Sequence, residues 1–172
     1  MSELSPEVRE RAAKIELLVL DVDGVFTDGR LWYGPEGEAL KAMDVRDGHG
    51  LVMLRECGLK LAVLSGRPQP LLKRRFEELR FTKVVERCIR KTEAIAEMAG
   101  ELGLELTQVA FIGDDLNDRG ALESVGLSCA PADAAPEIRA LVHHVCAASG
   151  GRGAVREVCE VILKARGQWP PW

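Results

Sequence analysis

The stretch Glu16-Leu-Leu-Val-Leu-Asp-Val-Asp-Gly24 joins a short apolar run to two carboxylates. An uninterrupted apolar run of this length is typical of a strand that is buried on both faces of a parallel sheet. Similar runs recur at 59–64, 83–85, 109–112 and 125–129, and segments with helical apolar spacing separate them. This alternation predicts an α/β fold, in which helices flank a parallel sheet.

The connecting segments complete the expected architecture. Apolar residues at helical spacing predict helices over the ranges 50–57, 68–79 and 92–102. A polar helical segment is expected over 5–14 and a final helix over 154–165. Between 25 and 43, the turn Gly34-Pro-Glu-Gly37 is flanked by strand-like alternation, which predicts a small inserted β-hairpin. The glycine-rich segment 149–153 is expected to be a flexible loop before the last helix. A chain of 172 residues with these elements is expected to form one domain, 1–172.

Composition and charge exclude several classes of protein. Apolar residues make up 47% and charged residues 29%, a balance that disordered and fibrous chains lack. The net charge is −4 and no long basic run is present, so nucleic-acid binding is not expected. The longest apolar stretch, 17–20, is far shorter than a membrane span, and the N-terminus lacks the apolar core of a signal peptide. We therefore expect a cytoplasmic protein that does not bind membranes.

The cysteine pattern carries little information about metals. Five scattered cysteines form no C-x-x-C pair, so reduced and mostly buried thiols are the simplest expectation. Cys146 follows His143 and His144, which is a weak signal for a zinc site.

Polar side chains gather where the predicted strands end. The first strand is followed by Asp21-Val-Asp23, the second by Ser65-Gly-Arg67, and the fourth by Gly113-Asp-Asp-Leu-Asn-Asp118. In an open parallel sheet, ligands bind beyond the carboxyl ends of the strands. Acids at adjacent strand ends repel one another unless a cation lies between them, and oxygen ligands suit Mg²⁺. The sequence therefore predicts a magnesium site.

These residue types point to phosphoryl transfer. The hydroxyl of Ser65 and the ammonium of Lys91 are groups that bind phosphate. Asp21 can attack phosphorus as a carboxylate nucleophile, and Asp23 can protonate the leaving alkoxide and then activate water. The candidate residues are Asp21, Asp23, Ser65, Lys91 and Asp114, which occur in this order along the chain, each after an apolar strand. This combination favours a catalytic interpretation over isolated turn or cap residues.

Some assignments have local competitors. Lys91 lies at an expected helix start, where a cation is electrostatically unfavourable, and this favours a functional role; Arg87 and Arg90 are nearby alternatives. Asn117 and Asp118 could serve only as helix caps.

The motifs resemble those of a known superfamily. Asp21–Asp28, Leu64–Gly66, Lys91 and Gly113–Asp118 are similar to the four ordered motifs of the haloacid dehalogenase (HAD) superfamily of phosphatases. The chain from about 16 to 167 further resembles the branch of 3-deoxy-D-manno-octulosonate 8-phosphate (KDO 8-phosphate) phosphatases. The segments that carry this second resemblance are Val45–Gly48, Ser65–Arg67, Gly126–Ser128 and Gly150–Cys159.

The resemblance implies a Rossmann-like HAD fold without a separate cap domain, and roles for individual residues. Asp21, the main-chain carbonyl of Asp23, and Asp114 would hold Mg²⁺. Asp21 would be the nucleophile, Asp23 the general acid and base, and Ser65 and Lys91 the phosphoryl contacts. Substrate contacts would come from Asp23, Asp44, Val45, Arg46, Asp47, Gly48, Arg67, Arg75 and Lys91. Arg75 could instead belong to the solvated face of a helix.

The implied activity is Mg²⁺-dependent hydrolysis of KDO 8-phosphate to KDO and phosphate, a step in lipopolysaccharide precursor synthesis, by a homotetramer whose hairpins shield neighbouring sites. Asp44 stands where this branch often has Asn, and 86–90 departs from the usual approach to the lysine. Arg67 favours an octulosonate over a nonulosonate. The alternatives are a phosphatase for a nonulosonate 9-phosphate, a non-catalytic oligomerisation module like that of CMP-sialate synthetases, and a phospho-receiver domain.

Overall fold

The predicted parallel sheet is present in the structure, a computed structural model that describes residues 4–172. Six strands lie in the order β5-β4-β1-β6-β7-β8, and every neighbouring pair is parallel. The strands are β1 Leu17–Leu20, β4 Lys60–Leu64, β5 Lys83–Val85, β6 Val109–Ile112, β7 Leu127–Ala130 and β8 His144–Val145. The central place of β1 puts its carboxyl end between those of β4 and β6.

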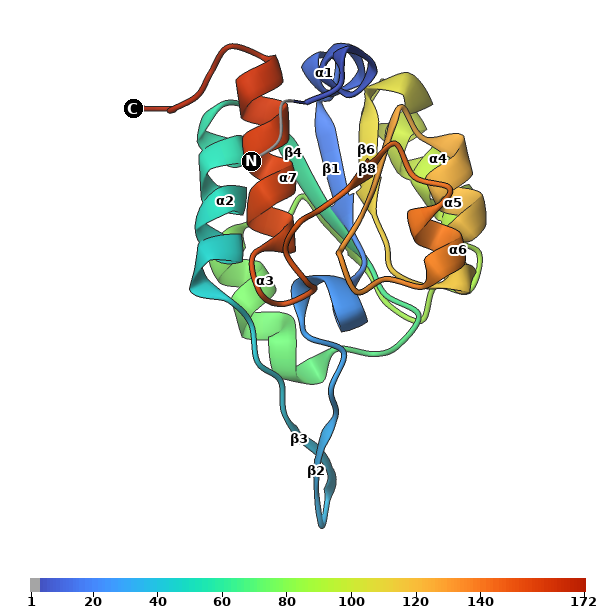
Figure 1. Cartoon of the computed structure of the whole chain (residues 1–172). Coiled ribbons are helices and arrows are strands. Elements are labelled where there is room, and N and C mark those ends of the chain that lie inside the picture. Colours follow the sequence, from blue (N-terminus) through green and yellow to red (C-terminus); the bar gives the residue numbers. More distant parts are fainter. Residues whose placement is uncertain (1–3) are drawn as a thin grey trace.

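Helices cover both faces of the sheet (Figure 1). The α-helices are α1 Pro6–Ala13, α2 Val45–Glu56, α3 Lys73–Leu79, α4 Lys91–Glu101, α5 Arg119–Ser124, α6 Pro136–Arg139 and α7 Ala154–Ala165. Short 3-10 turns occupy Pro70–Leu72, Leu106–Gln108 and Leu116–Asp118, and one π-type turn follows β1 at Val22–Phe26. Between residues 4 and 172, no helix has the length and apolar character that a membrane crossing requires.

Alternation along β1 divides the core into two layers. Leu18 and Leu20 point to the face covered by α1, α2, α3 and α7. Leu17 and Val19 point to the face covered by α4, α5 and α6. All four side chains are fully buried, as expected for a strand with apolar residues at every position. Two packed layers hold the carboxyl end of β1 in place.

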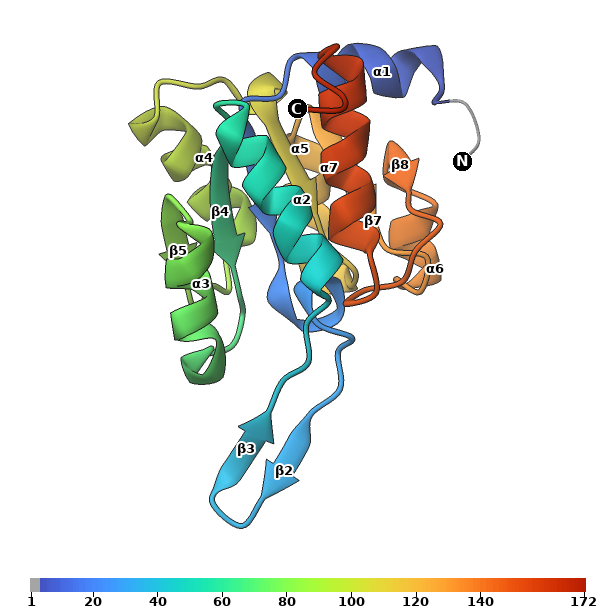
Figure 2. The same cartoon turned by 90° about the vertical axis from the view of Figure 1, so that its left-hand side faces the viewer.

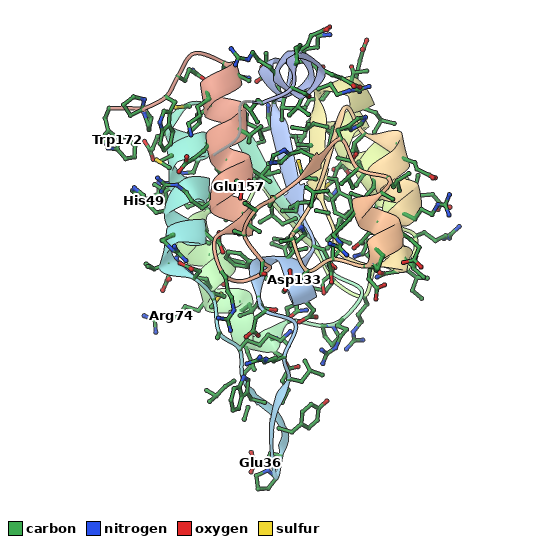
Figure 3. All side chains as sticks on the ribbon, in the orientation of Figure 1. Glu36, His49, Arg74, Asp133, Glu157 and Trp172 are labelled. Atoms are coloured by element: carbon green, nitrogen blue, oxygen red, sulfur yellow. The ribbon has the colours of Figure 1, made fainter. Side chains whose placement is uncertain are left out.

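The hairpin projects from the carboxyl edge of the sheet (Figures 1 and 2). Its strands are β2 Trp32–Gly34 and β3 Gly37–Leu40, which pair antiparallel. Glu36 lies at its tip (Figure 3), and a bridge between Thr27 and Met43 closes its base. The hairpin is therefore an insertion between β1 and α2, as the turn sequence predicts.

The structure departs from the expected elements in several places. The strand β8 and the helices α5 and α6 do not figure among the predicted elements, because they are too short to establish a period. Helix α2 begins at Val45 rather than at residue 50, since the Asp44 side chain caps it by accepting from the Arg46 N–H at 2.8 Å. Gly50 weakens helix propensity, but a Cβ there would lie 3.1 Å from Arg156 Cα, so glycine permits close packing on α7.

The glycine-rich segment 149–153 is packed rather than flexible. The Gly151 N–H donates to the Val25 carbonyl at 2.9 Å, and the Gly150 N–H donates to Asp133 Oδ1 at 2.9 Å; Asp133 is labelled in Figure 3. A Cβ at Gly150 would overlap the Gly24 carbonyl. Glycine is needed here because the segment lies directly on the turn that follows Asp21, and the expectation of a flexible loop was wrong.

Candidate active site

The carboxyl ends of β1, β4 and β6 bring the predicted catalytic residues together. The Asp21 N–H donates to the Ile112 carbonyl at 3.0 Å, so the β1–β6 pairing continues into the first residue of the site. A pocket of about 190 Å³ opens at this edge. It is lined by Asp21, Asp23, Ser65, Gly66, Arg67, Asp114, Asp115 and Asn117.

A buried ion cluster forms the floor of the site. Lys91 Nζ lies 3.0 Å from Asp21 Oδ1 and 2.5 Å from Asp118 Oδ1. All three side chains are buried, and Asp118 is fully enclosed. Burial by itself lowers the pKa of Lys91, but the charges of Asp21 and Asp118 outweigh it and raise that pKa above its ordinary value. Lys91 is therefore a fixed cation that orients Asp21.

Lys91 is distinguished from its neighbours by this burial. Arg90 is exposed and pairs with Glu93 at 3.1 Å, and Arg87 is exposed as well. The structure thus places Lys91, of the three candidates, beside the acids.

Asp118 is more than a helix cap. Its Oδ2 accepts from the Asp114 N–H at 3.0 Å while its Oδ1 contacts Lys91. It therefore links the β6 loop to the start of α4. The one sequence signal for this role is its place four residues after Asp114, which also suits a cap.

Three carboxylates converge beside a single cation. One oxygen each of Asp21, Asp114 and Asp118 lie within 4.8 Å of one another. Burial raises the pKa of Asp21 to about 6, against the opposing charge of Lys91. Burial and the nearby charges of Asp21, Asp118 and Asp115 raise the pKa of Asp114 to about 8. This excess of negative charge in a buried cluster fits a hard divalent cation.

The backbone at Gly24 makes room for this cluster. Gly24 has φ of 89°, which disfavours other residues, and a Cβ there would overlap the Asp114 carboxylate. The sequence Asp21-Val-Asp-Gly24 therefore turns sharply enough to set Asp114 against it.

Asp23 is held by two residues that the sequence interpretation missed. Lys41, from the chain just after β3, contacts its Oδ1, and Gln69 Nε2 donates to its Oδ2 at 2.8 Å. Lys41 Nζ also donates to Gln69 Oε1 at 2.5 Å, so each of the three side chains is hydrogen-bonded to the other two. The Lys41 side chain is only 2% exposed, although the backbone of the hairpin projects into solvent. No local pattern distinguishes a lysine in a hairpin or a glutamine between prolines as a site residue.

Ser65 faces the pocket with its proton available. Its Oγ accepts from the Arg67 N–H at 3.1 Å and from Gln69 Nε2 at 2.8 Å. A hydroxyl that accepts two hydrogen bonds keeps its own proton for a ligand oxygen. Arg67 Nη2 lies 2.9 Å from Glu38 Oε2 of the hairpin, so its guanidinium borders the pocket.

The predicted sugar-acid contacts at the start of α2 form a separate group. Arg46 pairs with Asp44 at 2.6 Å and donates to the Arg152 carbonyl at 3.1 Å. The buried Asp47 accepts from the N–H groups of Gly153 and Arg156 at 3.2 and 2.7 Å. Its carboxylate is thus an anchor for the glycine-rich segment.

Of the other three residues of that group, Gly48 and Arg75 lie side by side. Arg75 packs on the Cα of Gly48 and pairs with Glu78 at 3.1 Å, and the exposed Val45 begins α2. Asp44, Val45, Arg46, Asp47, Gly48 and Arg75 are not among the residues that line the 190 Å³ pocket.

A larger hollow of about 450 Å³ lies elsewhere, between α3 and β5. Phe76, Phe81 and Val84 form much of its wall, together with charged side chains at its rim. None of its lining residues belongs to the buried group of acids around Lys91, so the smaller pocket at the strand ends is the site with catalytic chemistry.

Comparison with known proteins defines the class first. Residues 77–157 match the family model of haloacid dehalogenase-like hydrolases. This range contains Lys91 and Asp118 of the ion cluster, and Asp114 beside it.

Whole-chain relatives then define the branch. The 3-deoxy-D-manno-octulosonate 8-phosphate phosphatase of Yersinia pestis is 44% identical over 163 residues, which are 95% of this chain and 87% of the relative. Its crystal structure superposes with a TM-score of 0.92 over 95% of this chain and 88% of that one. The chain belongs to the KDO 8-phosphate phosphatase family.

Two solved relatives carry ligands. The phosphatase of Moraxella catarrhalis, in complex with magnesium, phosphate and KDO, is 36% identical with a TM-score of 0.94 and covers 97% of this chain and 96% of its own. The cobalt-bound deoxy-D-mannose-octulosonate 8-phosphate phosphatase of Haemophilus influenzae is 40% identical with a TM-score of 0.89 and covers 92% of each chain.

Proposed function

We propose that this chain hydrolyses KDO 8-phosphate to KDO and inorganic phosphate with the help of Mg²⁺. The observation that carries the proposal is the juxtaposition of Asp21, Lys91 and Asp118 at the end of β1, with Asp114 beside them. The membership of the chain in the KDO 8-phosphate phosphatase family supports the substrate. One enzyme domain, 1–172, would carry the whole activity.

The donor set fits Mg²⁺. Asp21, the main-chain carbonyl of Asp23, and Asp114 would hold the ion, and the buried acids supply the negative charge that it would balance. Bound Mg²⁺ would neutralise charge on the phosphoryl oxygens and orient them toward Asp21.

The residues of the chain then divide the chemistry. Lys91 Nζ holds Asp21 Oδ1, so the carboxylate meets phosphorus in a fixed orientation. The bond from Asp21 to phosphorus forms as the bond from phosphorus to the sugar oxygen breaks, and Asp23 gives its proton to that oxygen. Asp23 then takes a proton from water, which attacks the aspartyl-phosphate and releases phosphate. Ser65 Oγ and Lys91 would contact the phosphoryl oxygens.

The pairs around Asp23 suit this proton transfer. Lys41 and Gln69 bind different oxygens of Asp23, so they fix the carboxylate while leaving it 22% exposed to the pocket. They are positioning residues for the general acid and base.

The residues that would bind the sugar acid lie at the edge of the pocket and beyond it. Arg67 borders it, and a guanidinium is suited to bind the carboxylate of a 2-ulosonic acid. The group formed by Asp44–Gly48 and Arg75 would complete the substrate contacts, with Asp47 acting through the backbone that it anchors.

Assembly and location are parts of the same proposal. The hairpin exposes Leu31, Trp32, Tyr33 and Leu40, which are 44%, 55%, 68% and 66% exposed. Apolar side chains gathered on a projecting hairpin favour contact with another subunit, and we propose a homotetramer that works in the cytoplasm.

The substrate is tested by comparing kcat/KM for KDO 8-phosphate with that for a nonulosonate 9-phosphate, both with Mg²⁺. The proposal predicts a preference for KDO 8-phosphate of at least about tenfold, the discrimination available from a few contacts. A preference for the nonulosonate phosphate would contradict the substrate and leave the reaction class standing.

A further inference from the structure

A second group of metal-ligating side chains lies away from the pocket. His144 belongs to β8, Cys146 follows it, and Glu157 comes from α7, labelled in Figure 3. One donor atom of each side chain lies within 4.8 Å of the others. None of these residues lines the pocket at the strand ends or takes part in the proposed reaction.

The local backbone directs the donors to one place. Residues two apart in an extended segment point to the same side, which brings His144 and Cys146 together against α7. The neighbouring His143 points elsewhere and lies 2.8 Å from Ser128 Oγ through its Nδ1. Of the two adjacent histidines, His144 is therefore the one presented to Glu157.

The polar atoms at this place are incompletely satisfied. His144 Nε2 is buried and makes no hydrogen bond, although Glu157 Oε1 lies 3.4 Å away. The buried Cys146 Sγ has the Ala154 carbonyl at 3.7 Å as a weak partner. A buried ring nitrogen without a hydrogen bond is costly, and a ligand that accepts its lone pair removes that cost.

Backbone hydrogen bonds fix the orientation of the Glu157 carboxylate. Its oxygens accept from the Ala147 N–H at 3.1 and 3.0 Å and from the Ala148 N–H at 3.2 Å. A carboxylate has further lone pairs, so these bonds fix its direction without preventing coordination. A cavity of about 140 Å³ adjoins the three donors and has room for a water ligand.

We propose that His144, Cys146 and Glu157 form a second cation site, suited to Zn²⁺ or a similar transition-metal ion, that fastens β8 to α7. Imidazole, thiolate and carboxylate are the ligand types of zinc, whereas the site near Asp21 offers only the oxygen donors that Mg²⁺ prefers. Tetrahedral zinc requires ligand atoms roughly 3.3–3.6 Å apart. His144 Nε2 and Glu157 Oε1 already lie 3.4 Å apart, and Cys146 Sγ lies within 4.8 Å of the other two donors. On binding, the thiol proton leaves to water and the sulfur lone pair forms the bond to the metal.

The test uses Co²⁺ as a spectroscopic probe of the full-length protein, in the presence of a large excess of Mg²⁺ to occupy the carboxylate site. The proposal predicts a thiolate-to-cobalt charge-transfer band, with about one Co²⁺ bound per chain at this site and displacement by Zn²⁺. Cys146→Ser and His144→Ala should each abolish the band. Cys57→Ser is the matched control, because that thiol lies at the end of α2, and it should keep the band.

A thermal shift separates loss of binding from misfolding. Zn²⁺ should raise the melting temperature of the wild type and of Cys57→Ser but not that of His144→Ala, while Mg²⁺ should shift all of them alike. Absence of the band in the wild type, or a band retained in Cys146→Ser, would overturn the proposal. Because this site shares no residue with the pocket, neither result depends on phosphatase activity.

Discussion

The sheet edge and the hairpin meet at the same pocket but are built in different ways. At the sheet edge, Asp21 and Lys91 are buried and are positioned by strands and helices of the core. In the hairpin, Trp32 and Tyr33 are exposed, and only Lys41 and Glu38 reach inward, to Asp23 and Arg67. Under the proposed mechanism, the core would supply the phosphoryl chemistry, while the hairpin would position Asp23 and Arg67 through Lys41 and Glu38.

Replacing the proposed nucleophile at the sheet edge should have the largest effect on activity. Asp21→Asn keeps the shape of the side chain and loses its charge, so phosphate release should fall by roughly 10⁴-fold or more. Phosphate release and near-ultraviolet circular dichroism measure activity and fold on the same sample. Turnover within about tenfold of the wild type would mean that another residue attacks phosphorus.

Lys41→Met tests the part of the hairpin that reaches inward. Loss of the ammonium leaves Asp23 with fewer fixed contacts, so kcat should fall by roughly 10- to 100-fold. The measurement is kcat for phosphate release at saturating substrate with Mg²⁺.

Arg30→Met is the matched control, because this cation of the same hairpin is 68% exposed and pairs only loosely with Asp28, at 4.0 Å. It should leave kcat unchanged. Equal effects of the two substitutions would show that the hairpin acts through its general charge and not through Asp23.

The stability of the sheet edge should depend on both Mg²⁺ and pH. In the metal-free protein the pKa of Asp21 is raised to about 6 and that of Asp114 to about 8, above the ordinary 3.8. Each acid therefore contributes most to stability while protonated, and that contribution is lost as the pH rises through these values. Mg²⁺ favours the ionised form of both acids, so its binding should offset this loss of stability.

The gain in melting temperature on adding Mg²⁺ should consequently grow with pH. We expect about 1 °C or less near pH 5.5 and about 4 °C or more near pH 8.5, measured by calorimetry. Asp114→Asn should flatten this dependence. A gain independent of pH would contradict the assignment of these acids as ligands.

Substitutions on the outer face of the hairpin should have the smallest effect on catalysis. Trp32→Ser combined with Leu40→Ser removes apolar surface, so the proposed tetramer should dissociate in analytical ultracentrifugation. Turnover of a small aryl phosphate should stay within about threefold, because the buried acids are untouched. Glu36→Ser at the hairpin tip is the control and should keep the assembly; an unchanged sedimentation coefficient in the double variant would exclude this face from the interface.

Sequence patterns predict the residues that a single strand positions, and they miss contacts between residues that are far apart in the chain. Asp21 and Ser65 each directly follow an apolar run, and Asp114 follows another after one glycine, so their placement at one sheet edge follows from the parallel strands. Gln69 and Lys41 meet Asp23 across separations of 46 and 18 residues, which no local pattern encodes.

The same limit applies to the glycine-rich segment and to Asp47. Composition suggested a flexible loop, but Gly150 is required by close packing on Gly24, a contact between distant parts of the chain. Asp47 fits a substrate-binding motif, and only the structure shows its carboxylate bound to backbone N–H groups of 153 and 156.

The central claim is tested most directly by phosphate release from KDO 8-phosphate by the wild-type protein, with Mg²⁺, after chelation, and after Mg²⁺ is restored. The account predicts turnover with Mg²⁺, its loss on chelation, and full recovery when the ion returns, at a kcat/KM well above that for an aryl phosphate. Absence of turnover with Mg²⁺, or turnover that chelation leaves unchanged, would contradict it.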